Sequence, residues 1–557
     1  MFISLFFNLR GLRCGLPSAE QTALVVPSAR TLEELTPALK ETRDRLYSEY
    51  DKTPGSYLEK GVIVQKEMIP VPVDGTRTAV DVRKIHSIRS ALLQSRFSDE
   101  QKMITSLTNI NPGRLRFNPH FFQYGGIFVY SAGLAIKISQ LLGLTRITPD
   151  ITYYFIHPGD ISNFFTAPKA LCGILETLSI PLIFILGKML FGSAAGLLSA
   201  VFLALIPSVP VEAHALKPYI LFFPFMISAL IFSKNIMESR RSKDYILAGI
   251  FCGLSAGTLI FSGVVGVSAL CAHFLSFRNK ESLKTRLLDK NILLLALSFL
   301  AAFFAANPYW IPAFNEVRAD FAYLSREVAF HVSGKNMLYH LLTEFPKAFG
   351  QPVYVMGVFG LLLSLKRFTG ADKLLLAAFL PAYFYLVCTL WYFFHYSMPL
   401  VPVFVIFAGR LGAFLIEKLK SRVLSYGLLA VVSLYTFGYS FYYSNIFAGF
   451  NGFSQAEGRW INENIPKGSS INCPVFPNFA SEGYPPFSIL NYKINEPGLS
   501  DYVIVVDYKA PETRAYAVPV NYALVRRSVL DKGVLGRVYK REALAFLDPE
   551  ISVYKLK

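Results

Sequence analysis

Three long apolar runs followed by a compact basic segment constrain this chain more than any other feature. The runs cover residues 164–191, 193–211 and 219–232. Each approaches the roughly 20 residues that an α-helix needs to cross about 30 Å of hydrocarbon. The segment SKNIMESRRSKD comes next and holds four basic residues, Lys234, Arg240, Arg241 and Lys243. Because short loops rich in Lys and Arg stay in the cytoplasm, we expect three membrane helices with this loop inside.

The turn between the second and third runs must then lie on the opposite side of the membrane. Its sequence is VEAHALKPY, which places Glu212, His214 and Lys217 together at the outer membrane face. Ionisable side chains are costly to keep beside lipid, so their presence at the edge of a span marks a candidate functional site.

Composition agrees with a membrane protein of many spans. Of the 557 residues, 53% are hydrophobic and 17% are charged, and the mean hydropathy is +0.40. A soluble protein of this length would be less apolar. The formal net charge of +17 falls largely in loops beside spans, where the positive-inside rule accounts for it. We therefore expect no nucleic-acid partner.

Seven further apolar runs follow the basic segment. They cover residues 245–260, 264–277, 291–312, 350–365, 374–393, 396–416 and 423–443. Basic residues gather at every second junction, namely Arg278, Lys280, Lys284, Arg286 and Lys290, then Lys366, Arg367 and Lys373, then Lys418, Lys420 and Arg422. This alternation predicts a bundle of ten transmembrane helices over residues 164–445.

The rest of the chain is predicted to lie outside the cytoplasm. Residues 1–9 are apolar but short for a span, so we expect either the tail of a first transmembrane helix that begins upstream or a segment in the interface. Residues 10–163 form the first outer loop, with an amphipathic helix starting near Thr31 and a helix over 119–143 along the membrane surface. Residues 446–557 have period-two runs in DYVIVVDY and ISVYKL, which predict a small soluble α/β domain.

An outer face of this kind favours chemistry on a substrate carried by lipid. Transfer of a sugar from a lipid phosphate needs a carboxylate to take a proton from the acceptor and cations to hold the charge of the leaving phosphate. Glu20, in LRCGLPSAEQ after the first apolar run, is placed to be that base. The alternative interpretation of Glu20 is a solvated loop residue, which spacing alone favours.

Several stretches, in this order, resemble one superfamily over nearly the whole chain. They are GLPSAEQ, NPHFFQYGG, APKALCGILETLSIPLIFILGKMLFGSAAGLLSAVFLALIPSVPVEAHALKP, FFAANPYWIPAF, HLLTEFPKAFGQPVYVMGVFGLLL, HYSMPLVPVF and RWINENIPKGSSI. The pattern resembles the polyprenyl-phosphate-sugar glycosyltransferases of the GT-C fold, which include protein O-mannosyltransferases and lipid A aminoarabinose transferases. The resemblance implies a polytopic GT-C-like helix bundle with a small C-terminal extracytoplasmic α/β domain.

The resemblance also assigns roles to residues. The family carries a catalytic acid in its first outer loop, usually Asp followed by Glu, and Ser18-Ala19-Glu20 is similar, so Glu20 takes that role while the Asp is missing. The second outer turn of the family usually offers another Asp. Here that place holds Lys217, which leaves open whether Glu212 takes the acidic role, whether Lys217 contacts a phosphate, or whether the chemistry has changed.

The remaining candidates are substrate-binding residues. The resemblance implies that Arg114, Arg116 and Lys169 help to hold the lipid phosphate, and His120 and Tyr124 are candidates to line the pocket. An aromatic belt at the membrane interface explains the last two as well. His214 and Lys217 complete the predicted substrate-binding set. A divalent metal at His214 beside Glu212 stays open, because one His with one Glu is a weak pattern.

Taken together, these observations predict an inverting membrane glycosyltransferase that moves a hexosyl or pentosyl group from a polyprenyl-phosphate donor to an extracytoplasmic glycan, lipid or protein. We expect a multi-pass protein of a bacterial plasma membrane, with its active site on the outer face. Two alternatives remain: a membrane transporter, for which Glu176 is the main carboxylate inside a helix, and a family member that binds lipid without catalysis.

Overall fold

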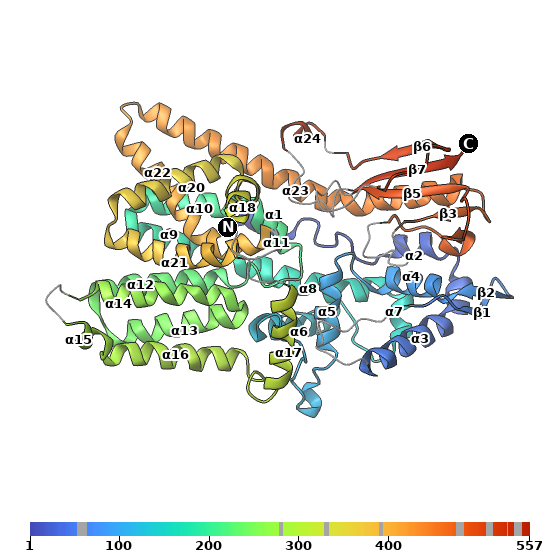
Figure 1. Cartoon of the computed structure of the whole chain (residues 1–557), viewed down its shortest axis with the longest axis horizontal. Coiled ribbons are helices and arrows are strands. Elements are labelled where there is room, and N and C mark those ends of the chain that lie inside the picture. The colour runs from blue at the N-terminus through green and yellow to red at the C-terminus, as the bar shows by residue number, and fades with distance from the viewer. Residues whose placement is uncertain are drawn as a thin grey trace. The chain divides into compact units, whose positions relative to one another are not determined.

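The computed structural model describes residues 1–52, 64–277, 282–327, 334–388, 394–474, 484–507, 516–531, 533–539 and 549–557. The chain is mainly helical, with strands in its N-terminal and C-terminal regions (Figure 1). Within these described residues, five helices are long and apolar enough to cross a membrane, namely Pro158–Phe191, Leu283–Ala306, Gly370–Val387, His395–Lys418 and Arg422–Asn464. Shorter apolar helices cover Gly126–Leu141, Ser193–Leu205 and Ile260–Leu275. The expected class, a multi-pass helical membrane protein with a small C-terminal α/β region, is confirmed.

The chain divides into two compact units. The first, here the helical unit, comprises Met1–Arg10, Ser106–Gly133 and Lys169–Ser444. The second, here the mixed unit, comprises Gly11–Thr105, Leu134–Pro168 and Asn445–Lys557. Among the described residues, four helices contribute residues to both units, namely α5 (Ser98–Leu107), α6 (Gly126–Leu141), α8 (Pro158–Glu176) and α23 (Arg422–Asn464).

The helical unit is built from apolar helices, several of which pack on helices that are not their neighbours in the sequence. Its main helices are α9 (Ser179–Phe191), α10 (Ser193–Leu205), α12 (Phe223–Ser239), α13 (Ser242–Thr258), α14 (Gly266–Leu275), α16 (Lys290–Ala306), α20 (Gln351–Arg367), α21 (Gly370–Val387) and α22 (Val401–Lys418). Of the basic residues predicted at the inner junctions, Arg278 and Lys280 lie outside the described residues.

Small residues allow these helices to approach closely, as is common where lipid gives no hydrophobic drive for helix association. Gly249 of α13 faces α16 so closely that a Cβ there would lie 2.5 Å from the Leu295 carbonyl oxygen. A Cβ on Gly360 of α20 would overlap the backbone of Phe407 in α22. These glycines are therefore packing residues.

The mixed unit begins with helices and a hairpin. The amphipathic helix α3 (Ala29–Lys52) packs on α4 (Val82–Leu93) and on β1 (Met68–Val73). The prediction that α3 starts near Thr31 was wrong by a few residues, because Ser28 Oγ accepts the Thr31 N–H at 3.0 Å and caps the helix. Strand β1 pairs with β2 (Thr76–Asp81) through Asp74 and Gly75, which both have positive φ and suit a two-residue hairpin turn.

A five-stranded sheet with the order β4-β3-β5-β7-β6 forms the C-terminal part of the mixed unit. Its strands are β3 (Ser470–Asn472), β4 (Lys493–Ile494), β5 (Tyr502–Asp507), β6 (Tyr522–Ser528) and β7 (Glu550–Leu556). Strand β3 runs parallel to β4 and β5, whereas β7 is antiparallel to β5 and β6. The two predicted strands, DYVIVVDY and ISVYKL, are confirmed as the paired β5 and β7.

The N-terminal and C-terminal polar regions share the mixed unit although the whole bundle separates them in sequence. Asn451 Oδ1 accepts the Gly15 N–H at 2.8 Å, and Asn462 Nδ2 donates to the Leu24 carbonyl at 3.0 Å. Lys84 Nζ donates to the Tyr492 carbonyl at 2.6 Å. Side-chain to backbone hydrogen bonds thus tie α23 and the tail to the residues near Glu20.

Candidate active site

The turn between α10 and α12 holds the ionisable residues predicted from sequence. Helix α10 ends at Leu205 because Ile206 precedes Pro207 and adopts the extended conformation that a following proline favours. A short helix, α11 (Ser208–Ala213), then carries Glu212 inward, where its side chain is buried.

Glu212 is a buried acid with one carboxyl oxygen that could accept a hydrogen bond from a ligand. Burial raises the pKa of its carboxyl to about 7, and the Lys217 ammonium opposes this effect. Among the described residues, Glu212 Oε2 is buried and has no hydrogen-bond partner. A carboxyl in this state can exchange a proton near neutral pH and can accept a hydrogen bond from a ligand.

His214 joins this turn to the start of the chain. Its Nδ1 lies 2.6 Å from the Pro210 carbonyl oxygen, and its Nε2 lies 2.8 Å from that of Arg10. Burial lowers the pKa of the imidazole to about 4, although the two carbonyls raise it. Because both ring nitrogens contact backbone oxygens, His214 is a positioning residue in this arrangement. Within the described ranges, no three or more His, Cys, Asp or Glu gather as metal ligands.

Two lysines complete a group that we name the ionisable cluster, namely Lys169, Glu212, His214 and Lys217. The Lys169 side chain of α8 is fully buried and close enough to His214 to lower the pKa of the imidazole. Lys217 is partly buried and interacts electrostatically with Glu212. The cluster thus contains two lysines and one glutamate, and this excess of basic side chains favours an anionic ligand.

Aromatic residues border the cluster, and sequence reasoning named one of them. Tyr219 interacts electrostatically with Tyr124, Tyr396, Lys217 and Glu212. The rings of Tyr219 and His395 are in contact, with centroids 4.6 Å apart and planes tilted by 39°. Of these, Tyr124 was predicted, whereas Tyr219, His395 and Tyr396 were missed. The sequence held one indication of these missed residues, because the pair His395-Tyr396 stands at the start of an apolar run on the predicted outer side of the membrane.

The other predicted substrate-binding residues lie in more exposed positions of the helical unit. Arg114 ends a short 3₁₀ turn (Pro112–Arg114) and Arg116 follows it, both with exposed side chains. His120 is half exposed, and its Nδ1 lies 2.7 Å from Glu316 Oε2. Within the described residues, neither arginine forms an ion pair or hydrogen bond with the ionisable cluster. Their role in phosphate binding stays a prediction.

Glu20 belongs to the mixed unit. It lies in the first turn of α2 (Ala19–Val25), which Ser18 caps by accepting the Gln21 N–H at 3.1 Å. Its side chain is exposed, and Gln455 Nε2 lies 3.4 Å from Glu20 Oε2. The carboxylate is thus accessible to an acceptor from water. Because Glu20 and the ionisable cluster belong to different units, their meeting at one site stays a prediction.

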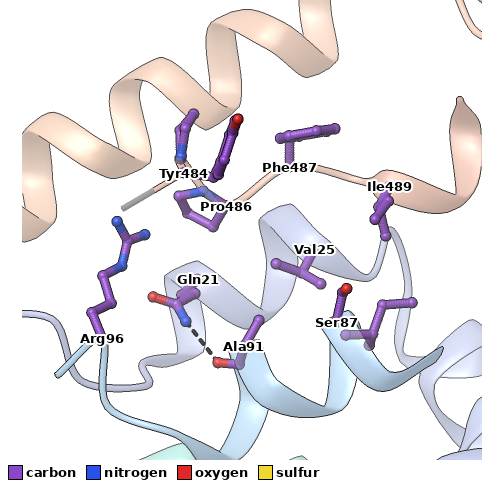
Figure 2. Close-up of a pocket in the computed structure, with 11 residues that line it drawn as sticks. Gln21, Val25, Ser87, Ala91, Arg96, Tyr484, Pro486, Phe487 and Ile489 are labelled. Atoms are coloured by element: carbon purple, nitrogen blue, oxygen red, sulfur yellow. Dashed lines mark hydrogen bonds between the residues drawn. The ribbon is translucent and has the colours of Figure 1, made fainter. Parts of the chain in front are cut away.

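A pocket adjoins the helix that carries Glu20 (Figure 2). Gln21 and Val25 of α2 and Ser87, Ile88 and Ala91 of α4 line it together with Arg96, Ile489 and the segment 484–487. Gln21 Nε2 donates to the Ala91 carbonyl at 2.6 Å, which ties the two helices together. The empty volume is about 350 Å³, including space open to solvent. Its walls are mainly apolar, with the Arg96 guanidinium and a few polar groups among them.

Comparisons with known proteins bear on the helical unit. Residues 164–310 match the family model described as dolichyl-phosphate-mannose-protein mannosyltransferase. All four residues of the ionisable cluster fall inside this range. The match confirms, over these residues, the resemblance to polyprenyl-phosphate-sugar glycosyltransferases. No protein of curated function matches the chain.

Solved structures give distant likenesses. ArnT from Cupriavidus metallidurans bound to undecaprenyl phosphate is 11% identical with a TM-score of 0.43, covering 87% of this chain and 83% of that one. Its apo form is 12% identical with a TM-score of 0.42, covering 69% and 79%. The oligosaccharyltransferase AglB from Archaeoglobus fulgidus, in complex with an inhibitory peptide and a dolichol-phosphate, is 11% identical with a TM-score of 0.38, covering 67% of this chain. The present chain spans 57% of the AglB length.

Proposed function

We propose that this protein transfers a sugar from a polyprenyl-phosphate donor to an acceptor that enters from the outer aqueous side. The observation that supports the proposal most directly is that the family match at 164–310 contains the ionisable cluster. A positively balanced, buried cluster beside a membrane helix suits the phosphate of a lipid-linked donor.

The proposed reaction is a single displacement at the anomeric carbon. A carboxylate takes the proton of the acceptor hydroxyl while the oxygen of that hydroxyl forms the new glycosidic bond. The bond between the anomeric carbon and the phosphate oxygen breaks, and its electron pair leaves with the polyprenyl phosphate. Lys169 and Lys217 would stabilise the charge that develops on this phosphate. Inversion at the anomeric carbon follows from one displacement.

Two carboxyl groups are candidates for the base, and they predict different behaviour. Glu20 is exposed, so an acceptor can reach it directly. Glu212 is buried with a pKa of about 7, so it would act only when a ligand opens or fills the cluster. We assign the base to Glu20 and give Glu212 the role of orienting Lys217, with which it interacts.

Release of polyprenyl phosphate from a panel of polyprenyl-phosphate sugars tests the proposal. We expect turnover by the wild type and a loss of 10²-fold to 10⁴-fold in E20Q, the range for removal of a general base. The matched control is E67Q, which changes another exposed glutamate of the mixed unit and should keep full activity. Near-normal turnover by E20Q would remove Glu20 from the mechanism.

The same assay separates the two alternatives. A protein that binds lipid without catalysis would retain the donor but release no phosphate with any acceptor. A transporter would move a solute across the membrane of proteoliposomes without cleaving the donor.

The Glu176 carboxylate, the main intramembrane acid, accepts hydrogen bonds from Ser4 at 3.1 Å and from Asn8 at 3.0 Å. These contacts give it a structural role in fastening α1 (Phe2–Leu9) to α8.

A further inference from the structure

A buried arginine of helix α4 faces helix α3 in the mixed unit (Figure 1). Arg89 is 7% exposed, and within the described residues its Nε is buried and has no hydrogen-bond partner. His86 precedes it by three residues on α4, whereas Arg43 and Tyr47 are four residues apart on α3, which packs on α4. We name Arg43, Tyr47, His86 and Arg89 the arginine group.

The side chains that surround Arg89 do not balance its charge. Arg89 Nη2 lies 3.0 Å from His86 Nδ1. Burial and the Arg89 charge lower the pKa of this imidazole to about 3, so His86 is neutral. Burial, opposed by Tyr47 and assisted by the Arg43 charge, lowers the pKa of Arg89 to about 10, so its guanidinium stays charged at pH 7. A tyrosine phenol and a neutral imidazole leave that charge uncompensated.

The acidic side chains close to these helices are engaged elsewhere. Asp44 is half exposed and lies 3.1 Å from the Nε of Arg43, so it acts at the surface. Asp81, at the start of α4, pairs with Arg83 at 2.6 Å. Helix α7 (Ile151–Ile156) contacts both α3 and α4, and its sequence ITYYFI contains no acid. Within the part of the chain that the structure describes, the buried guanidinium therefore lacks a carboxylate partner.

A buried charge is costly unless a counter-charge and hydrogen bonds compensate it. We propose that the arginine group binds a phosphate group, with the Arg89 guanidinium at the inner end and Arg43 at the opening. The flat fork of a guanidinium matches two oxygens of a phosphate, and two guanidinium groups favour a dianion over a singly charged carboxylate. Arg43 is 26% and Tyr47 39% exposed, which leaves the group accessible from water.

The Tyr47 ring holds the outer guanidinium in place. Arg43 Cζ lies 5.6 Å from the centroid of that ring, within the range of a cation–π contact. A phosphate between the two arginines would therefore meet one guanidinium fixed by burial and one fixed by an aromatic face.

The arginine group is separate from the pocket beside Glu20. Ser87 and Ala91 of α4 line that pocket (Figure 2). Each residue turns a helix by about 100°, so Arg89 lies on nearly the opposite face of α4 from these two side chains. The phosphate would thus belong to a second site, independent of the proposed sugar transfer. Its source is either free phosphate or a phosphate monoester carried by a glycan.

Modification of arginines by phenylglyoxal in the purified full-length protein tests the site. Peptide mass spectrometry reads the rate at Arg43 separately from the rate at Arg45, with phosphate, a hexose phosphate monoester, acetate or chloride present at equal ionic strength. Arg45 is the matched control because it lies on the same helix, is 41% exposed and pairs with Glu67 at 2.6 Å. Since each arginine is read individually, phosphate bound at the ionisable cluster does not affect the comparison.

We expect phosphate to slow the modification of Arg43 at least about threefold, which corresponds to two-thirds occupancy, and to leave Arg45 unchanged. Arg89→Met should abolish this protection, because it removes the inner guanidinium. Equal effects on Arg43 and Arg45, no protection of Arg43, or undiminished protection in R89M would each overturn the proposal. Equal protection by acetate would also overturn it, since the site would then not prefer a dianion.

The comparison of Arg43 with Arg45 in the wild type needs no variant, so it decides the matter even if R89M is unstable. Size-exclusion chromatography checks that R89M is folded. Stronger protection by the hexose phosphate than by inorganic phosphate would support a site for a phosphorylated glycan, and the reverse order would support a site for free phosphate.

Discussion

The Lys217 ammonium lowers the pKa of the Glu212 carboxyl, while burial raises it to a net value of about 7. The two residues lie five positions apart, on the turn that links α10 to α12. Burial, the larger effect, and the opposing charge of Lys217 together set the protonation state of the Glu212 carboxyl. This relationship gives the ionisable cluster a dependence on pH that can be measured both with and without substrate.

Stability should respond to the protonation of Glu212. The folded-state pKa of about 7 exceeds the ordinary value near 4.3, so the folded protein holds a proton that the unfolded chain loses. The stability linked to this proton is fully present below about pH 4 and is lost as the pH rises through 7. Glu212→Gln removes the effect, so it should raise the free energy of unfolding by up to about 3 kcal/mol at pH 8 and change little at pH 4.5.

Thermal unfolding in detergent at the two pH values measures this difference. The control is E238Q, which changes a glutamate with a 59% exposed side chain and should give the same small shift at both. If E212Q and E238Q behaved alike at pH 8, Glu212 would be ionised and well solvated in the folded protein.

Removal of Lys217 should move the pH dependence of sugar transfer. Because the ammonium lowers the pKa of Glu212, Lys217→Met should raise that pKa. If the rate of sugar transfer changes with pH near 7 because Glu212 titrates, this change should move to higher pH in the variant. Lys217→Arg keeps the charge and should leave the change at the same pH. A lower rate in K217M with an unaltered pH dependence would mean that Lys217 acts on the donor phosphate alone.

Close packing of α20 on α22 predicts a contrast between two glycines. Gly360→Ala would place a methyl group onto the Phe407 backbone, which cannot move without separating the helices, so we expect a loss of roughly 2 kcal/mol or more. Gly427→Ala in α23 meets nothing within 4 Å and should be neutral or stabilising by up to about 1 kcal/mol, since alanine favours the helix. Thermal unfolding of both variants measures the difference, and equal stability would show that α20 and α22 can separate freely.

Local patterns in the sequence predicted the features that depend on neighbouring residues. The alternation of apolar runs with basic junctions indicated the helical class, and period-two runs located β5 and β7. Lys217 and Glu212 were named because they sit in one turn. Each of these inferences depends on a periodicity or a charge within a few residues.

Contacts between distant residues were beyond such reasoning. The Nε2 of His214 contacts the Arg10 carbonyl, 204 positions away in sequence, and Asn451 contacts Gly15 across 436 positions. No spacing rule relates these residues, because the intervening helices decide which ends meet. The same limit explains why His395 was missed, since its position beside Tyr219 is set by helix packing.

The ion pair that joins β6 to α23 should be important for the mixed unit. Glu457 has a side chain that is 5% exposed, and Arg526 binds both of its oxygens while its guanidinium lies 4.9 Å from the centroid of the Trp460 ring. Arg526→Ala would leave a buried carboxylate unpaired, with an expected loss of about 3 kcal/mol. Arg45→Ala, which breaks an exposed arginine–glutamate pair, should cost less than about 1 kcal/mol.

Urea unfolding followed by the fluorescence of Trp460 measures both variants, and E457Q/R526M should recover part of the loss. Similar values for R526A and R45A would show that the Glu457 carboxylate reaches water once its partner is removed.

Sidedness of the membrane helices underlies the proposed function and can be tested by labelling single cysteines in intact cells. Leu216, in the predicted outer turn, is 1% exposed, so a cysteine there would be shielded on either side. Gly113 is a better outer position, because it is exposed and a Cβ there meets one side-chain atom, at an ordinary 3.5 Å. Ser239, exposed at the end of α12 beside the basic segment, is the inner position.

An impermeant maleimide should label Gly113→Cys in intact cells and Ser239→Cys only after permeabilisation. The reverse pattern would place the ionisable cluster on the cytoplasmic side and would exclude a donor presented at the outer face.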